Sequence, residues 1–210
     1  MFDLDGTITR HDTLGPYIAG FLAHHPAGLL GLPRVLPALA AFAFGKADHG
    51  AVKSALIRAT LGGRSRSEID SWTAQFVGSL PQRVFRDALT RIEHHRAAGD
   101  TLVLLSASTD LYVPALARAL GFTQCICTGV EWQGEELLGR LTTPNRRGEE
   151  KVRCLEQLRA QYPGAWVSAY GNSPADIPHL VKADRPTLVN GNGRARTLAA
   201  AHGIPCATWH

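Results

Sequence analysis

Two acids separated by one residue, with glycine and threonine after them, occur within the first seven residues, MFDLDGT. A carboxylate such as Asp3 can attack phosphorus and form a covalent intermediate, which divides one difficult hydrolysis into two easier steps. A second carboxyl group, Asp5, can protonate the leaving oxygen and then activate water. Gly6 allows a close backbone turn, and Thr7 offers a hydroxyl and an amide to a phosphate. Together with the polar clusters described next, the segment suits phosphoryl transfer.

Three further polar clusters follow predicted strands or begin a predicted helix: Ser106-Ala107-Ser108, Lys151, and Gly171-Asn172-Ser173 with Asp176. Ligands of doubly wound sheets bind outside the carboxyl ends of the strands, where such clusters fall. Phosphoryl transfer needs these groups, because amides, a cation and a metal must neutralise the phosphate oxygens. Taken singly, Ser106 also fits a helix N-cap, Lys151 a surface charge and Asp176 an early-helix acid. Their joint order after the first motif favours one site.

The four motifs in this order resemble those of the haloacid dehalogenase superfamily of phosphatases, and the resemblance covers essentially the whole chain. Within the superfamily, the chain is similar to the subfamily that includes phosphoserine phosphatase, in which a helical cap follows the first motif. The resemblance implies that Asp3 is the nucleophile of an aspartyl-phosphate intermediate and that Asp5 is the general acid and base. It also implies that the cofactor is Mg²⁺.

The resemblance assigns the remaining motif residues to the phosphate and to the metal. Thr7, Ser106 and the amide of Ala107 match phosphate ligands. Lys151 matches the lysine that holds the nucleophile and the phosphate by charge. The implied Mg²⁺ ligands are Asp3, the backbone carbonyl of Asp5, Asn172 and Asp176.

Asn172 departs from the family pattern, in which the fourth motif is most often Gly-Asp rather than Gly-Asn. An amide oxygen can bind Mg²⁺, but the substitution removes one negative charge from the ligand set. We therefore expect weaker Mg²⁺ affinity and a higher Mg²⁺ requirement, with activity retained because the other motif residues are present.

Helical and strand patterns alternate beyond residue 82, which predicts a doubly wound, Rossmann-like parallel sheet in an α/β fold. The apolar runs 101–108, 123–132, 165–173 and 185–191 have strand length. A turn and strand at 134–144 predict a hairpin at the sheet edge. The predicted helices are 81–100, 109–122, 146–164, 174–184 and 192–203.

The block 13–82 is predicted to be all helical and includes a capping-box pattern, Ser65-x-x-Glu68. A helical block inserted after the first motif is typical of a cap over an active site. The sequence therefore predicts an α/β core formed by residues 1–12 and 83–210 and an α-helical cap at 13–82.

An apolar stretch within the cap has two interpretations. Residues 13–33 contain no Asp, Glu, Lys or Arg, and the run VLPALAAFAFG follows Arg34. The stretch is long enough to span a membrane, but His24, His25, Pro26 and Pro33 interrupt it. We expect two buried helices separated by proline-containing turns. The alternative is a helix hairpin that rests on a membrane surface.

The substrate is expected to be chosen by the cap. Asp12 lies where phosphoserine phosphatases usually carry a Glu that contacts the substrate amine, so the shorter side chain weakens the case for phosphoserine. Lys53 and Arg58 are candidates for a second anionic group, or ordinary surface charges. A small phosphorylated metabolite is the first prediction. The alternatives are a phospholipid head-group phosphatase at a membrane, since the apolar stretch is similar to that of phosphatidylglycerophosphate phosphatases, and a catalytically weak phosphate-binding member.

The bulk composition limits the partners and the compartment. The net charge is +4, but the arginines are scattered and no nucleic-acid-binding motif accompanies them, which argues against nucleic acid. The four cysteines form no CxxC pair, and no secretory signal is evident, so we expect a cytoplasmic protein, or one peripheral on the cytoplasmic membrane face. Nothing favours one oligomeric state. Because only Met1 and Phe2 precede Asp3, we expect either an unusually short central strand or, preferably, a natural chain that begins a few residues earlier.

Overall fold

The first three residues lie in the middle of a parallel sheet in the computed structural model, which describes residues 1–210. Phe2 pairs with Leu104 on one side and with Tyr170 on the other, so the sheet order is β2-β1-(Met1–Asp3)-β5-β6-β7. All of these pairs are parallel, and the predicted doubly wound fold is confirmed. The strands are β1 (Val103–Thr109), β2 (Gln124–Thr128), β5 (Ser168–Gly171), β6 (Arg185–Val189) and β7 (Cys206–Ala207).

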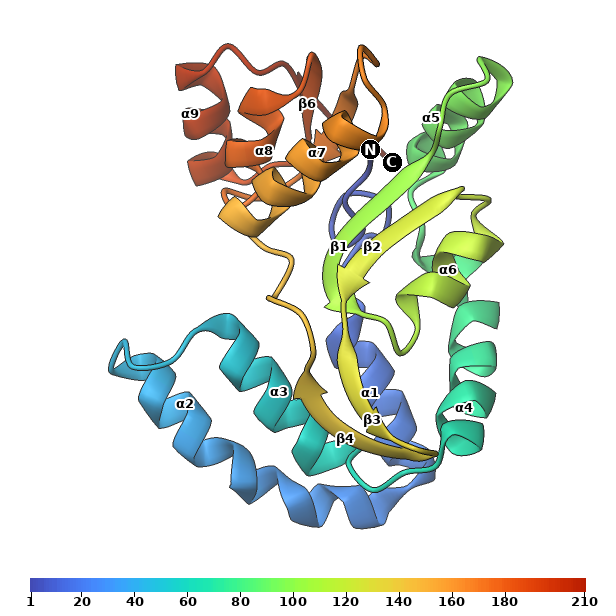
Figure 1. The fold of residues 1–210 in the computed structure, drawn as a ribbon, viewed down its shortest axis with the longest axis vertical. Helices are drawn as coiled ribbons and strands as arrows, with labels where there is room; N and C mark the ends of the chain where they lie inside the picture. Colours follow the sequence, from blue (N-terminus) through green and yellow to red (C-terminus); the bar gives the residue numbers. More distant parts are fainter.

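Successive residues of the central strands face opposite sides of the sheet, because side chains alternate along a strand. Phe2 and Leu104 belong to one hydrophobic cluster, while Met1 and Leu105 belong to another. Helices cover each face (Figure 1). On one face lie α5 (Arg86–Ala97) and α6 (Val113–Ala119); on the other lie α7 (Glu149–Gln161), α8 (Ile177–Lys182) and α9 (Gly193–Ala201).

The predicted helical block is confirmed, and its helices are called the cap below. Its fourth α-helix begins with the predicted capping box, in which the Ser65 side chain accepts from the Glu68 amide and the Glu68 carboxylate accepts from the Ser65 amide. The cap comprises α1 (Leu14–His24), the 3₁₀ helices η1 (Pro26–Val35) and η2 (Leu80–Arg83), α2 (Leu36–Ala43), α3 (His49–Thr60) and α4 (Arg66–Gly78).

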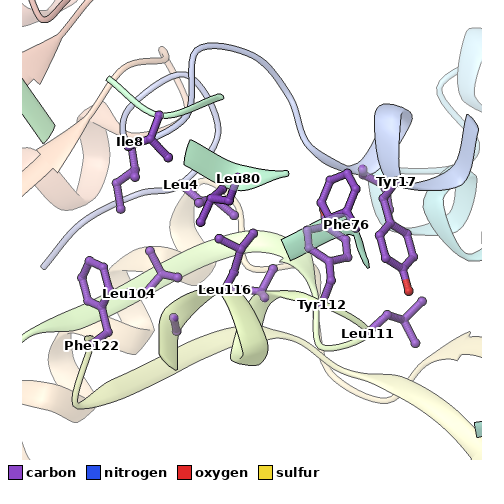
Figure 2. Packing of buried hydrophobic residues seen from close by; sticks show 14 of the residues in the cluster. Leu4, Ile8, Tyr17, Phe76, Leu80, Leu104, Leu111, Tyr112, Leu116 and Phe122 are labelled. Carbon is purple, nitrogen blue, oxygen red and sulfur yellow. The ribbon is translucent and has the colours of Figure 1, made fainter. Parts of the chain in front are cut away.

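Cap and core meet in a single hydrophobic cluster. Tyr17 of α1 and Phe76 of α4 pack against Tyr112, next to α6, in the same cluster that contains Leu4 and Leu104 (Figure 2). The two chain segments that connect cap and core also pair with one another. Thr9 lies antiparallel to Val84, the Arg10 amide donates to the Arg83 carbonyl, and the Phe85 amide donates to the Ile8 carbonyl.

The predicted edge hairpin is wrong in its position. The run 123–132 divides at Gly129, and β3 (Val130–Gln133) pairs antiparallel with β4 (Glu136–Leu141) as a separate sheet that packs on α3. The chain stops pairing with β1 after β2 because the next backbone amides donate to side chains instead of to β1. The Gly129 amide donates to Thr143 Oγ1, and the Val130 amide donates to Asp110 Oδ1. The hairpin therefore extends toward the cap, as Figure 1 shows.

The prediction of two buried apolar helices holds only for the first. In α1, Tyr17 and Phe21 are fully buried, whereas no residue of α2 is buried. The stretch Pro26–Ala43 is the one helical stretch whose length and composition would allow it to cross a membrane, with a mean hydropathy of 1.4 and 11% of its residues buried. Its fold places most large apolar side chains on the outside of the molecule.

Candidate active site

A cavity of about 470 Å³ opens where the cap faces the carboxyl ends of the sheet strands. Its walls come from the segments after Met1–Asp3, β1 and β5, from the start of α7 and from α3. The structure therefore brings together most of the residues that the sequence singled out. Those that line the cavity are Asp3, Asp5, Asp12, Lys53, Ala107, Lys151, Asn172 and Asp176.

Lys151 lies between two buried carboxylates. Its Nζ donates to Asp3 Oδ1 and to Asp176 Oδ1, each at 2.6 Å, and all three side chains are less than 9% exposed. Burial alone would lower the pKa of Lys151, but the two carboxylates outweigh it and raise the pKa above its ordinary value. Lys151 is therefore a permanent cation beside Asp3.

The two carboxylates bound by Lys151 differ in their other partners. Asp176 Oδ2 accepts from the amides of Asn172 and Ser173 and from the Ser173 hydroxyl, at 2.7–3.2 Å. Burial opposes its ionisation, but Lys151 and these donors hold its pKa below the ordinary range. Burial raises the pKa of Asp3 to about 7, and Lys151 only partly opposes that rise. Asp176 thus holds both Lys151 and the 171–173 turn in place. Asp3 Oδ2, in contrast, accepts a single hydrogen bond, from Thr7 Oγ1.

Thr7 and Ser106 lie behind the cavity wall rather than on it. Thr7 Oγ1 donates to Asp3 Oδ2 at 3.1 Å, and its amide donates to the Leu4 carbonyl, so both groups predicted for the phosphate have protein partners. Ser106 is fully buried and its Oγ accepts from the Ser108 amide at 3.0 Å. In this structure Thr7 orients Asp3, and its predicted contact with the phosphate stays a prediction. Ala107 and Ser108, not Ser106, lie on the cavity surface.

Asp5 is held by two residues that the sequence predictions did not assign. Thr13 donates to Asp5 Oδ1 from its amide at 2.7 Å and from its hydroxyl at 2.6 Å, and Ser108 Oγ donates to Oδ2 at 2.6 Å. Burial, with the nearby charge of Asp12, raises the pKa of Asp5. A carboxyl group with a raised pKa is suited to deliver a proton. The only sequence signal for Ser108 was its place in the second polar cluster.

The three predicted substrate residues of the cap region have different positions. Lys53 Nζ donates to the Ala107 carbonyl and to Asn145 Oδ1, and burial lowers its pKa to about 8 even though Asp5 and Asp12 oppose that shift. Asp12 lines the cavity, and its Oδ1 accepts from two amides at the start of α1. Arg58 is exposed, packs over β4 and does not line the cavity, so its predicted contact with the substrate stays a prediction.

Four basic residues of the cavity wall were not assigned from the sequence. Arg10 and His11 follow the first motif, His49 begins α3, and Arg147 precedes α7. None belongs to a recognisable motif, and only the fold brings them to one place. Four Lys or Arg side chains and four carboxyl groups therefore share the cavity wall: Arg10, Lys53, Arg147 and Lys151 with Asp3, Asp5, Asp12 and Asp176.

The donor set at the base of the cavity fits Mg²⁺, which prefers oxygen ligands in octahedral geometry. The Asp3 carboxylate and the Asn172 side chain both line the cavity, and the Asp5 carbonyl accepts no backbone hydrogen bond. Asn172 lies directly against Gly6. Asp176 has hydrogen-bond donors on both oxygens, so its predicted part in the metal site stays a prediction.

Replacement of Gly6 by alanine tests this packing. Gly6 has φ +78°, and a Cβ there would lie 2.0 Å from Asn172 Nδ2. Because both the backbone and the contact oppose a side chain, we expect Gly6→Ala to lower the free energy of unfolding by about 1–3 kcal/mol and to weaken the Mg²⁺ response. Urea unfolding and Mg²⁺ titration measure the two effects. Gly134→Ala is the matched control, because Gly134 has φ +58° and open space around it. Equal effects in both variants would contradict the proposed contact.

The comparisons with known proteins agree with this geometry. The model of a family described as haloacid dehalogenase-like hydrolase matches residues 1–180. The chain belongs to this family. Protein CicA of Caulobacter vibrioides is 31% identical over 185 residues, which cover 87% of this chain and 82% of CicA. A Mycobacterium tuberculosis protein named probable phosphatase is 29% identical over 97% of this chain and 72% of its own length.

Solved haloacid dehalogenase-like structures share the fold. A phospho-aspartyl intermediate analogue of phosphoserine phosphatase covers 98% of this chain and 90% of its own, with a TM-score of 0.67 and 15% identity. At that identity the likeness establishes the fold alone. The resemblance and the fold class predicted from the motifs are both confirmed, and the chain is a haloacid dehalogenase-type hydrolase with phosphatases among its relatives.

Proposed function

We propose that this haloacid dehalogenase-like hydrolase is a Mg²⁺-dependent phosphatase that cleaves a phosphomonoester through an aspartyl-phosphate on Asp3. The observation that carries the proposal is that two buried carboxyl groups with different partners line one cavity. Asp3 contacts the permanent cation Lys151, while Asp5, two residues later, is held by the neutral donors Thr13 and Ser108. A nucleophile beside a cation and an acid beside the leaving group are what phosphoryl transfer to a carboxylate requires.

The first step forms a bond between an Asp3 oxygen and phosphorus and breaks the bond from phosphorus to the leaving oxygen. Asp5 gives its proton to that oxygen, so the alcohol departs neutral. Thr7 holds Asp3 Oδ2, and Lys151 lies close enough to balance the phosphate charge. Asp3, the Asp5 carbonyl and Asn172 would hold Mg²⁺, which would supply charge neutralisation for the phosphate oxygens and the nucleophile.

The second step releases the phosphate. Asp5, now ionised, accepts a proton from water, whose oxygen attacks phosphorus as the bond to Asp3 breaks. Thr13 and Ser108 stabilise the ionised Asp5 through three hydrogen bonds, which suits a group that must change protonation state once in each half-reaction. The products are inorganic phosphate and free Asp3.

The substrate class follows from the cavity wall and its size. Arg10, Lys53 and Arg147 add positive charge beyond the site where the phosphoryl group would lie. A volume of about 470 Å³ accommodates a small phosphorylated molecule or head group. Asp12 leaves one carboxylate oxygen without a hydrogen-bond donor at this wall and would favour a substrate with a hydroxyl or amine.

Phosphate release from a panel of phosphomonoesters tests the proposal. The panel includes p-nitrophenyl phosphate, phosphoserine and a sugar phosphate, each assayed with Mg²⁺ and with EDTA. We expect release with Mg²⁺ and almost none with EDTA. A folded protein that binds phosphate but releases none from any substrate would support the catalytically weak alternative instead.

Asn172 offers a direct test of the metal site. Asn172→Asp adds a negative charge next to Asp3, so we expect the Mg²⁺ concentration for half-maximal activity to fall by about tenfold. Asn172→Ala removes the ligand oxygen, and the same concentration should rise. Mg²⁺ titrations of the initial rate measure both. If the three proteins share one Mg²⁺ dependence, residue 172 is not a ligand.

A further inference from the structure

The helical stretch Pro26–Ala43 carries a continuous apolar outer surface, together with Phe44 just after it. Leu30 is 83% exposed and Phe44 is 80% exposed, although such side chains usually lie inside a protein. Seven large apolar residues within the sixteen positions from 29 to 44 are exposed, and this set is called the apolar face. Its members are Leu29, Leu30, Leu32, Leu36, Leu39, Phe42 and Phe44.

Small residues, not the leucines, attach this stretch to the rest of the cap. A Cβ on Gly31 would lie 1.8 Å from the Ala59 carbonyl oxygen, and one on Gly28 would lie 3.0 Å from the Thr60 carbonyl oxygen. The backbone of η1 therefore touches the backbone of α3 directly. Because the glycines occupy the inner side, the leucines beside them are directed outward. The apolar face is therefore exposed because the glycines of η1, and not its leucines, pack against α3.

The helical stretch that carries the apolar face contains one basic residue and no acid, and the next acid along the chain is the exposed Asp48, which caps α3. Residues 13–47 contain no Asp or Glu, and their only Lys or Arg residues are Arg34 and Lys46. Both cations are exposed, and Arg34 lies within the stretch while Lys46 follows it. An apolar helix face with basic residues and no acid is complementary to the surface of a bilayer that contains anionic lipids.

The apolar face reaches the rim of the active-site cavity. Phe42 packs against His49, with ring centroids 4.8 Å apart, and His49 lines the cavity. One turn further along α3, Lys53 lines the same cavity. In Figure 1, α2 and α3 lie side by side and their connecting turn points to the open side between cap and core. A molecule held at the apolar face is thus next to the entrance.

We propose that the apolar face docks on the surface of an anionic bilayer and that the phosphomonoester cleaved is the head group of a lipid in that bilayer. The acyl chains stay in the membrane, the apolar face lies among them, and the head group enters the cavity past His49. The docking stands on the exposed face alone, whereas the lipid substrate also rests on the phosphatase activity proposed above.

Flotation with vesicles tests the docking independently of activity. The protein is mixed with vesicles of phosphatidylcholine with or without phosphatidylglycerol and centrifuged through a density gradient. The test variant is Leu30→Glu/Phe44→Glu, which changes two exposed residues outside the cavity. The matched control is Leu89→Glu/Trp166→Glu, which changes two exposed apolar residues of the core, 44% and 75% exposed. We expect the wild type and the control to float with anionic vesicles and the test variant to stay in solution.

Four results would overturn the docking. Wild type that does not float has no membrane affinity, and a test variant that floats like wild type binds through another surface. Wild type that forms a dimer in sedimentation without lipid, abolished by Leu30→Glu/Phe44→Glu, shows that a second copy covers the face. Wild type that resists extraction from vesicles at alkaline pH would show a spanning rather than an interfacial helix, and this also contradicts the proposal.

Turnover separates the two parts of the proposal. Phosphate release is measured from p-nitrophenyl phosphate in solution and from phosphatidic acid in the anionic vesicles. We expect equal rates for all three proteins on the first substrate, and a rate roughly tenfold lower for the test variant on the second. If the wild type floats and cleaves p-nitrophenyl phosphate but releases no phosphate from phosphatidic acid, the proposed lipid substrate is wrong. No release from either substrate points to failure of the phosphatase proposal itself.

Discussion

Asp3→Asn abolishes phosphate release and leaves a protein that is at least as stable as the wild type. The amide is a poor nucleophile, so the aspartyl-phosphate cannot form, and we expect the rate to fall by about 10⁴-fold or more. Initial rates with Mg²⁺ on the most rapidly cleaved substrate measure the effect. Turnover that survives this substitution would rule out Asp3 as the nucleophile.

The stability of Asp3→Asn has a pH dependence whose sign is fixed by the raised pKa. Burial shifts the pKa of Asp3 from 3.8 to about 7, so the folded protein holds a proton that the unfolded chain releases between those values. The folded state is therefore penalised as pH rises through that window, fully above about pH 7 and not at all below about pH 4. Asparagine avoids the penalty. In metal-free buffer the variant should melt above wild type at pH 8, and the difference should shrink toward pH 4.

The matched control for this experiment is Asp70→Asn, which removes a carboxylate from an exposed position of α4. Calorimetry with EDTA gives the melting temperatures of Asp3→Asn and Asp70→Asn at pH 4 and at pH 8. Each is compared with wild type at the same pH. A melting temperature of Asp3→Asn below wild type at pH 8 would mean that the ion pair with Lys151 outweighs the burial of Asp3. The control should show no pH-dependent difference.

Lys151→Met removes a buried cation from between two carboxylates and should cause the largest loss of stability of any substitution in the site. Lys151 is 3% exposed, and Asp3 and Asp176 would be left near each other without it. Breaking a buried ion pair in this way costs about 3–5 kcal/mol, because an uncompensated charge stays buried. Urea unfolding at pH 7 measures the loss, and the exposed Lys182→Met is the control.

The pH dependence of this loss runs opposite to that of Asp3. Lys151 holds the pKa of Asp176 below its ordinary value of 3.8, so the stability that the pair contributes is full above that pH and is lost as the pH falls through the lowered pKa. The pair therefore contributes fully both near pH 4 and at pH 7, so the cost of Lys151→Met should fall only at a pH below 3.8. Adding Asp176→Asn should restore part of the loss. Additive effects of the two substitutions would contradict a direct interaction between them.

The motifs predicted which residues lie together because each places a residue type at a strand end or at the start of a helix. Asp3, Asp5, Lys151 and Asp176 lie where the alternation of strands and helices required. Side-chain direction was not predictable in the same way. Whether the Thr7 hydroxyl turns to Asp3 or to the cavity depends on the tight turn at Gly6, and the sequence does not encode that choice in any periodic pattern.

The sequence also did not predict which segments far apart in the chain contact one another. Arg58 shares α3 with Lys53, but its position five residues later puts it on another side of the helix, over Gly139. The apolar stretch was expected to be buried because hydropathy reports composition and not what a helix packs against. The close approach of Gly31 to Ala59, which turns the leucines outward, exists only once both helices are in place.

The cluster that joins cap and core has a consequence for how this enzyme can diversify. Tyr17, Phe76 and Tyr112 pack in the same apolar cluster as Leu4, which lies between Asp3 and Asp5 in the chain. A substitution that reshapes the inner side of the cap therefore also lowers the stability of the core around Asp3 and Asp5. The free energy of unfolding of a protein is small, so few such substitutions are tolerated. New substrate preferences are expected to arise through residues that line the cavity without entering this cluster, such as His49 and Arg147. Transplanting a relative's cap would succeed only if the aromatic residues on both sides were exchanged together.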